Sequence, residues 1–183
     1  MKYAQSKGVL LVHAAGNSAR NIDTSWNFPT PLFKDQTRAS NWITVGASGD
    51  QKAGGITAGF SNYGKKEVDV FAPGVQIYST VPGGNTYMNL QGTSMASPVV
   101  AGVAAFLLSY YPDLTAEQLK SIIEKSAQSP GVKVKEPGTG ETVDLKEISK
   151  TGGLVNAYEA IKLAASMSEK KPGKSRVNEE KKN

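Results

Sequence analysis

The sequence contains no cysteine and only one histidine, His13. Its own residues can therefore build no disulfide, no thiol nucleophile and no cysteine-based metal site. No group of His, Asp and Glu residues has the spacing of metal ligands, so we expect neither a metal site nor a cofactor. Any reaction that needs an imidazole base has only His13 to draw on within this chain.

Long apolar runs and strong overall charge are also lacking. No run reaches the roughly 18 apolar residues of a membrane span, so no membrane span is expected. The formal net charge is +5, and residues 168–183 supply +3 of it, with six Lys or Arg against three Glu. The remaining charge is nearly balanced. Because nucleic-acid binding favours basic residues spread over a folded face, no nucleic-acid partner is expected.

The length and composition fit one soluble domain followed by a tail. The chain has 183 residues, of which 39% are hydrophobic, enough for one core. We expect the domain to occupy residues 1–165. Residues 166–183 are charged and lack core side chains, so we expect a disordered tail.

The hydrophobic pattern predicts an α/β fold. Val9–Ala15 is a continuous apolar run, typical of a strand buried on both faces of a parallel sheet. A short helix over Lys2–Lys7 is expected before it, stopped by Gly8. A long polar connection over 17–39 should follow it. Further short strands are predicted over 42–46, 56–62, 68–71, 75–80 and 86–90.

Three helices and one irregular stretch are expected in the second half of the chain. Met95–Tyr110 has no polar face, so it is predicted to be buried all round. Thr115 and Gln118 fit a capping box that opens an amphipathic helix. Residues 130–153 should be irregular, and Asn156 should cap a last helix over 157–165.

The segment Gly92–Pro98, which reads Gly-Thr-Ser-Met-Ala-Ser-Pro, carries the main chemical signal. Gly92 allows a sharp turn and a close approach of substrate. Ser94 then lies at the positive end of an apolar helix, where backbone N–H groups can face a developing negative charge. The alternative is that Ser94 merely caps the helix, as serine often does. The fully apolar helix behind it favours a nucleophile.

A second signal, Ala14-Ala15-Gly16-Asn17, ends the first apolar strand. Asn17 could be an ordinary turn residue, or its side-chain amide could donate to the oxyanion of a tetrahedral intermediate. Together with Ser94, the oxyanion role is the better interpretation. His13 lies inside the strand, and we expect a histidine of the core or sheet face rather than the base for Ser94.

Both signals resemble motifs of the subtilisin-like serine proteases, the subtilases. Gly92–Gly102 resembles their nucleophile motif, and Ala14–Asn17 resembles their oxyanion-asparagine motif. Four further segments match the family in the same order along the chain: Trp42–Ala47, Phe60–Gly64, Val68–Gly74 and Gly152–Ala157. The resemblance as a whole covers about Lys2 to Ala165.

The resemblance implies a parallel, doubly wound sheet with helices on both faces. It implies a serine endopeptidase that cleaves polypeptides through an acyl-enzyme on Ser94, with Asn17 and the Ser94 N–H as oxyanion donors. Ala15 and Gly16 would form one wall of the substrate cleft. It also implies an extracellular or periplasmic protein.

One part of the family pattern has no counterpart in this sequence. The family's catalytic residues run Asp, His, Ser along the chain, and neither the Asp nor the His motif is found here. We therefore expect a fragment that lacks the N-terminal part of its domain, which becomes its implied partner, and that is inactive alone.

Two alternatives remain. One is an inactive relic or binding module of the same fold. The other is an unrelated serine esterase, which would need a Gly-x-Ser-x-Gly turn and a histidine after the serine; no histidine follows Ser94.

Overall fold

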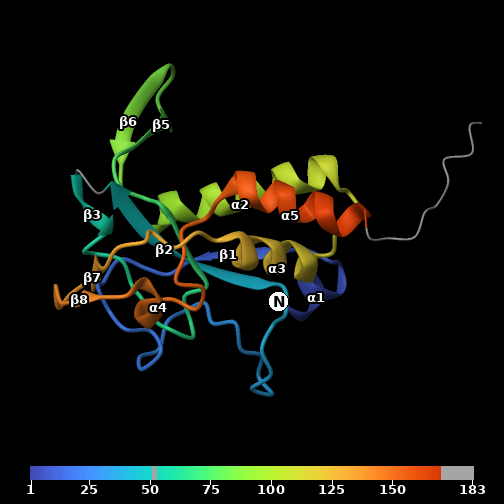
Figure 1. The fold of residues 1–183 in the computed structure, drawn as a ribbon, viewed down its shortest axis with the longest axis horizontal. Coiled ribbons are helices and arrows are strands. Elements are labelled where there is room, and N and C mark those ends of the chain that lie inside the picture. Colours follow the sequence, from blue (N-terminus) through green and yellow to red (C-terminus); the bar gives the residue numbers. More distant parts are fainter. Residues whose placement is uncertain (51–52, 170–183) are drawn as a thin grey trace, which may run out of the picture.

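The computed structural model describes residues 1–50 and 53–169 (Figure 1). Its centre is a sheet in which β2 (Trp42–Asp50) lies between β1 (Leu11–Ala14) and β4 (Val70–Pro73), and both neighbours run parallel to it. A fourth strand, β3 (Ala53–Thr57), pairs with β2 in the antiparallel sense. The predicted α/β class with a parallel sheet is confirmed.

Helices cover one face of this sheet. Ile43, Val45 and Ala47 alternate along β2 and pack in one apolar cluster with residues of three helices. The helices are α2 (Thr93–Tyr110), α3 (Ala116–Ser126) and α5 (Ala157–Glu169). Figure 1 shows α2, α3 and α5 lying along the sheet, while the short α1 (Lys2–Ser6) lies near the N-terminus.

A second, smaller core lies on the other side. Phe71 of β4 packs there with Leu145 and Ile148 at the two ends of α4 (Leu145–Ile148). Residues 130–153, expected to be irregular throughout, thus contain this short helix and the strand pair β7 (Val134–Lys135) and β8 (Thr142–Val143).

A β-hairpin stands clear of the body (Figure 1). It consists of β5 (Ile77–Val81) and β6 (Thr86–Leu90), which pair along their whole length. Only residues 91 and 92 separate the end of the hairpin from the start of α2, so the hairpin is attached directly to the segment that carries Ser94.

Both helix caps predicted from the sequence are confirmed. The Thr115 hydroxyl accepts from the Gln118 N–H at 3.2 Å, and the Gln118 side chain accepts from the Thr115 N–H at 2.8 Å. Asn156 Oδ1 accepts from the Glu159 N–H at 3.0 Å. Helix α5 runs to Glu169, past the predicted end at residue 165, and Met167 packs against the core.

The expected boundary between the domain (1–165) and the tail (166–183) therefore falls within helix α5. The division into domain and tail stays a prediction. Of the expected tail, residues 170–183 lie outside the part of the chain that the structure describes.

Two predictions of complete burial are wrong. Helix α2 buries only part of its circumference, and β1 is half-buried along its length. Within the described residues β1 pairs with β2 alone, so its other edge has no strand beside it. An apolar sequence predicts that a segment is buried, but it does not show whether other residues of this chain pack against that segment.

A third prediction is wrong in part. The strand expected over 56–62 ends at Thr57, because the chain turns instead. The Ser61 N–H donates to the Ala58 carbonyl at 2.9 Å, and the Ser61 hydroxyl accepts from the Ala47 N–H at 3.0 Å. The turn leaves Asn62 free for the contacts described below.

Helix α2 also qualifies the expectation about membranes. Its eighteen residues are long and apolar enough to cross a bilayer by length and composition, and about a third of that stretch is buried. Core helices of soluble proteins pass the same test, so this is weak evidence for a span.

Candidate active site

Two turns far apart in the sequence meet at the candidate site. One follows β1 and contains Gly16 and Asn17; the other opens α2 and contains Gly92, Thr93 and Ser94. Thr93 joins them. Its hydroxyl accepts from the Gly16 N–H at 3.0 Å and lies 2.9 Å from Asn17 Oδ1, to which it donates. The structure thus brings together the two motifs that the sequence singled out.

The Asn17 side chain has a fixed orientation. Its Oδ1 accepts two hydrogen bonds from Thr93, one from the backbone N–H and one from the hydroxyl, each at 2.9 Å. An oxygen with two donors identifies the carbonyl end of the amide, so the other end is the Nδ2 donor. Asn17 is exposed, and its Nδ2 group lies beside Gly92.

The Nδ2 group of Asn17 and the hydroxyl of Ser94 face the same small space above Gly92. A Cβ atom built on Gly92 would lie 3.1 Å from Ser94 Oγ and 3.2 Å from Asn17 Nδ2. Gly92 itself has φ of 150°, a conformation that L side chains rarely adopt. Glycine at this position therefore leaves the space open between a hydroxyl and an amide donor.

Ser94 does not cap α2. The N-cap is Gly92, and Ser94 lies in the first turn, where its N–H has no carbonyl of a preceding turn to bond. Its side chain is exposed, and within the described residues its hydroxyl makes no hydrogen bond. The helix-cap alternative for Ser94 is therefore wrong; Asn17 instead caps α2 from another segment, through the Thr93 N–H.

Two asparagine side chains, Asn62 and Asn27, hydrogen-bond to the backbone just before Asn17. Ala15 is fully buried, and its carbonyl accepts from Asn62 Nδ2 at 2.8 Å and from Asn27 Nδ2 at 3.0 Å. The Gly16 carbonyl accepts from the Asn62 N–H at 2.8 Å. Ala15 thus lies inside the wall, while Gly16 is half-buried at its surface.

Gly16 has no room for a side chain. Its φ is +100°, and a Cβ atom there would lie 2.5 Å from Asn62 Nδ2. Asn62 Oδ1 also accepts from the N–H groups of Ser18 and Arg20, at 3.0 and 3.1 Å. Asn62 therefore fixes the turn on both sides of Asn17.

Sequence reasoning did not single out Thr93, Asn62 or Asn27 as site residues. Thr93 and Asn62 stand within segments that resemble the family, Gly92–Gly102 and Phe60–Gly64. The resemblance of these segments to the family could have marked both residues as part of the site. The structure shows which atoms they bond. Asn27 belongs to the polar connection and carried no signal.

His13 is not beside Ser94. Its ring packs on Trp42, with 4.9 Å between the ring centroids. It lines a cavity of about 300 Å³ under residues 22–32, and neither Ser94 nor Asn17 lines that cavity. Burial lowers the pKa of His13. The prediction of a sheet-face histidine is confirmed.

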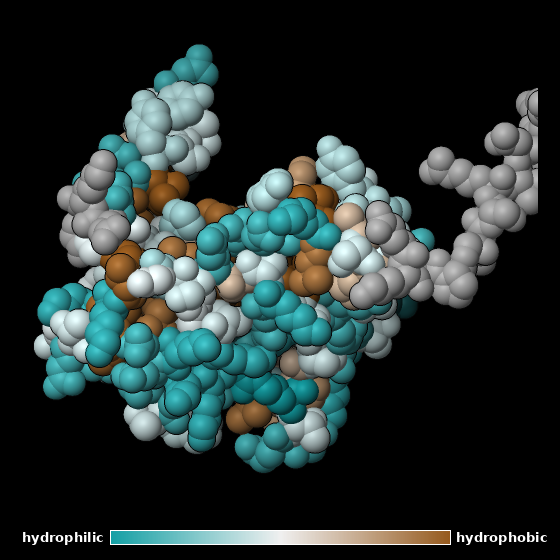
Figure 2. Space-filling model, in the orientation of Figure 1, coloured by the Kyte–Doolittle hydropathy of each residue, from teal (hydrophilic) through white to brown (hydrophobic). Residues whose placement is uncertain are grey.

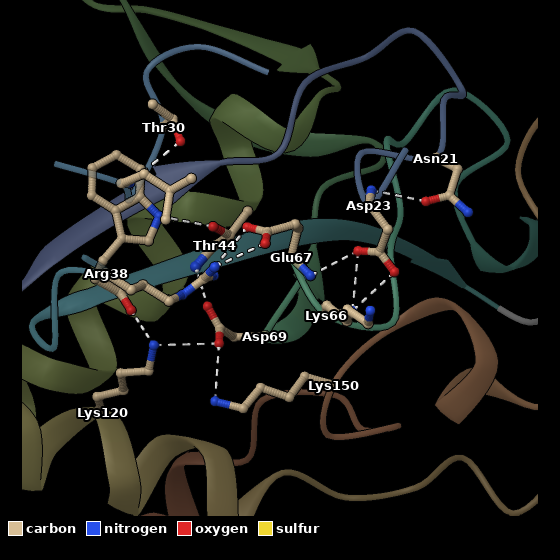
Figure 3. Close-up of polar contacts among 12 residues, drawn as sticks. Asn21, Asp23, Thr30, Arg38, Thr44, Lys66, Glu67, Asp69, Lys120 and Lys150 are labelled. Carbon is tan, nitrogen blue, oxygen red and sulfur yellow. Dashed lines mark hydrogen bonds and ion pairs between the residues drawn. The ribbon is translucent and has the colours of Figure 1, made fainter. Parts of the chain in front are cut away.

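The most deeply buried charge lies away from this site, at β4 (Figure 3). Asp69 is 1% exposed and has Lys120 and Lys150 at 3.4 and 3.5 Å, while its Oδ2 accepts from the Thr44 N–H at 2.7 Å. Burial raises the pKa of Asp69 to about 6, although Lys120 acts in the opposite direction. Both lysines also contact Glu124, so the cluster ties α3 to β4.

Acidic and histidine side chains form no cation site in the part of the chain that the structure describes. Over residues 1–50 and 53–169, no group of three or more His, Cys, Asp or Glu could hold a metal ion.

Comparison with known proteins gives the class. The family model described as "Subtilase family" matches residues 1–158. Subtilisin DY of Bacillus licheniformis is 41% identical over 129 residues, which are 70% of this chain and 43% of that protein. The thermostable alkaline protease of Halalkalibacterium halodurans is 44% identical over 124 residues, 68% of this chain and 30% of that protein.

Solved structures agree with the sequence comparisons. The self-cleaved protease domain of PatA superposes with a TM-score of 0.66 at 26% identity, covering 90% of this chain and 53% of that one. A protease from Pseudoalteromonas arctica gives 0.63 at 30% identity, covering 89% and 45%.

The fold is therefore that of subtilisin-like protease domains, and the chain belongs to the subtilase family. It spans less than half the length of the two curated relatives named above.

Proposed function

We propose that this chain is the nucleophile-bearing part of a serine endopeptidase, with Ser94 as the nucleophile. One observation carries the proposal: Ser94 Oγ and Asn17 Nδ2 border the same space above Gly92. A hydroxyl and an amide donor facing one reacting centre are what acyl transfer needs. The family membership supports the reaction class, and polypeptides are the proposed substrates.

In the proposed mechanism, Ser94 Oγ attacks the carbonyl carbon of a peptide bond and gives its proton to a base. The carbonyl oxygen becomes an oxyanion, which accepts from Asn17 Nδ2 and from the Ser94 N–H. The intermediate collapses, the C–N bond breaks, and the base returns the proton to the leaving amine. Water then attacks the ester carbon and gives a proton to the base. The second intermediate collapses, the bond from the acyl carbon to Ser94 Oγ breaks, the base returns the proton to Oγ, and the carboxylic acid leaves.

Thr93 and Asn62 serve this mechanism by position. Thr93 occupies Asn17 Oδ1, so that Nδ2 is the end of the amide directed at the oxyanion. Asn62 holds the wall formed by Ala15 and Gly16, along which the substrate backbone would lie.

The base has to come from residues other than those described, because His13 faces a different cavity. We propose that a polypeptide part bearing the family's Asp and His supplies it, which makes that part the chain's main partner. We also propose an extracellular or periplasmic location, from the family resemblance.

A second candidate is an inactive relic or binding module of the same fold. The lack of any base among the described contacts of Ser94 favours it. In that case Asn17 would serve only to fasten α2 to the turn after β1 through Thr93, and Ser94 would have no part in that contact.

Labelling by a fluorophosphonate, which reacts with an activated serine, separates the two candidates. The isolated chain should not be labelled. Mixing it with the Asp- and His-bearing part of subtilisin DY should produce labelling, and Ser94→Ala should abolish it. Asn17→Ala should lower turnover by about 10² to 10³ with little change in KM. Failure of the mixture to label while the two parts are shown to be associated would favour the relic.

A further inference from the structure

The turn after Asn17 contains a backbone conformation that its sequence does not favour. Ala19 has φ of 51°, in the left-handed region that residues with a Cβ atom rarely adopt. Such a conformation persists only where the surrounding structure holds it in place. Ala19 lies two positions after the proposed oxyanion donor, so whatever holds Ala19 also limits where the backbone of Asn17 can lie.

One neighbouring segment binds the N–H groups of this turn. Asn62 Oδ1 accepts from the Ser18 N–H and from the Arg20 N–H, at 3.0 and 3.1 Å. The Ala19 N–H, which lies between them in the sequence, donates to the Phe60 carbonyl at 2.9 Å. Three successive N–H groups are therefore held by the same segment.

The tip of the β7–β8 hairpin, residues 136–141, contacts the same turn through Gly138. A Cβ atom built on Gly138 would lie 2.6 Å from the Ala19 carbonyl oxygen and 3.4 Å from the Ala19 Cβ atom. Gly138 also has φ of +87°, so both its conformation and this close approach require a glycine. Ala19 thus has its N–H bonded to Phe60 and its carbonyl group against Gly138.

Contacts within the hairpin and with the core hold its tip in place. Val134 of β7 is buried in the second core, and Pro137 is buried where the tip begins. The Gly140 N–H donates to the Glu136 carbonyl at 2.9 Å, and the Thr139 hydroxyl donates to the Glu136 carboxylate at 2.6 Å. The tip is therefore a fixed surface against which the turn packs.

Tyr63 connects the tip to the turn by a second route. Its N–H donates to the Arg20 carbonyl at 3.0 Å, and its side chain packs in the second core with Val134. Its hydroxyl lies beside the carboxylate of Glu136. The hairpin and the turn are thus joined through a buried side chain as well as through Gly138.

The outer side of the hairpin faces water. Residues 138–142 are exposed, and the edge of the molecule at β8 is mostly hydrophilic in Figure 2. A hydrophilic edge suits water better than a docked protein. We therefore interpret the tip through its contact with the turn that follows Asn17.

We infer that the tip of the β7–β8 hairpin, through Gly138, is a positioning element for Asn17 in the proposed reaction. This inference rests on the proposed function. An oxyanion donor is most effective when it is already held where the charge will form. Thr93 determines which end of the Asn17 amide is available, and Gly138 limits how far the backbone beside Asn17 can move. Gly138 acts through Ala19 rather than by contact with the substrate.

The test compares two glycines of the same tip. Gly138→Ala places a Cβ atom against the Ala19 carbonyl, whereas a Cβ atom on Gly140 would meet no atom within 4 Å. Both glycines have a positive φ, +87° and +73°, so Gly140→Ala strains the backbone of the tip in the same way. The comparison therefore isolates the contact with the turn.

Activity on a peptide substrate is measured after the chain is combined with the Asp- and His-bearing part of subtilisin DY. We expect Gly138→Ala to lower kcat at least about fivefold with KM little changed, since a small displacement of a catalytic group weakens transition-state binding. Gly140→Ala should keep the kcat of the unchanged chain. When Asn17→Ala is already present, Gly138→Ala should change kcat by less than about twofold, because the donor that it positions is gone.

Hydrogen–deuterium exchange of the isolated chain reports on the turn without any chemistry. Mass spectrometry at low protein concentration follows a peptide that contains residues 17–22. We expect this peptide to exchange at least about fivefold faster in Gly138→Ala than in Gly140→Ala, because its bonds to Asn62 open more often. A peptide from α3 should exchange equally in both variants, which would show that the effect is local.

The inference is overturned if Gly138→Ala and Gly140→Ala have the same kcat, or if the loss in Gly138→Ala is undiminished without Asn17. Equal exchange of the 17–22 peptide in the two variants overturns it as well. A difference in exchange between variants that show no activity in any combination would support the hold of the tip on the turn and count against the proposed function.

Discussion

The carboxamide oxygen of Asn17 accepts both hydrogen bonds that Thr93 donates, from its N–H and from its hydroxyl, at 2.9 Å each. Thr93 is 1% exposed, so both of its donors are shielded from bulk water, although Asn17 itself is exposed. The residue before the proposed nucleophile thus determines which end of the Asn17 amide is available to a substrate.

Replacing Thr93 with Val removes the hydroxyl and keeps the shape. When the Asp- and His-bearing part supplies the base, we expect kcat to fall at least about tenfold with KM little changed, because the bond that the hydroxyl donates to Asn17 and the bond that it accepts from the Gly16 N–H are both lost. Thr93→Ser keeps the hydroxyl and should retain most activity. In a cycle with Asn17→Ala the two losses should not add, because both act through one amide. Full additivity would contradict the positioning role.

Gly16→Ala should lower the free energy of unfolding by about 1 to 3 kcal/mol, because the new Cβ meets Asn62 and the backbone has a positive φ. Gly59→Ala is the control, since a Cβ on Gly59 would meet no atom within 4 Å. Urea unfolding followed by tryptophan fluorescence, to which Trp26 and the buried Trp42 both contribute, measures both variants at low protein concentration. Equal stability of the two would show that the turn at Gly16 relaxes at little cost.

Asp69 should give stability an unusual dependence on pH. The pKa of Asp69 is about 6 in the folded chain and near 3.8 when unperturbed, because burial disfavours its charge. The folded state then binds the proton more tightly, so this group's contribution is fully present below pH 4 and is lost as the pH rises through 6. The charged groups that act on it are Lys120, Glu124 and Lys150, with Arg38 interacting at longer range.

Asp69→Asn removes this titration. Unfolding measured at several pH values should show the variant gaining stability relative to the unchanged chain between about pH 4 and pH 6, then holding constant. The reverse trend, with Asp69→Asn losing ground as the pH rises, would mean that the two lysines outweigh the cost of burial.

The isolated chain should self-associate as its concentration rises. The open edge of β1 and the uncharged side of α2 both face water, and such surfaces bind other copies. Sedimentation velocity over a concentration series tests this. Ala105→Glu should reduce the association, whereas Tyr158→Glu should not. A monomer at all concentrations would contradict the prediction.

The local parts of this fold were readable in the sequence. The capping box at Thr115, the cap at Asn156 and the position of His13 each depend on residues a few places apart. The convergence of Ser94 with Asn17 was anticipated through the family resemblance. The role of Thr93 was not, because its bonds to Gly16 and Asn17 span 76 or 77 positions.

Other features were misread for a physical reason. The apolar residues of α2 and β1 predicted burial, but burial depends on what packs against a segment, and part of that cover is lacking among the described residues. The strand predicted over 56–62 stopped early because Ser61 and Asn62 bond to β2 and to the Gly16 turn. Periodicity carries no information about such distant partners.

The separation between Asn17 and Thr93 also has a consequence in time. A ribosome that adds about 5 to 20 residues per second needs roughly 4 to 15 s to pass from one to the other. Throughout that interval the Asn17 amide has no α2 to cap, and the apolar side chains of β1 lack the helix that packs against them. The pace of translation therefore sets the earliest moment at which this site can exist, and factors that shield nascent chains have those seconds in which to act.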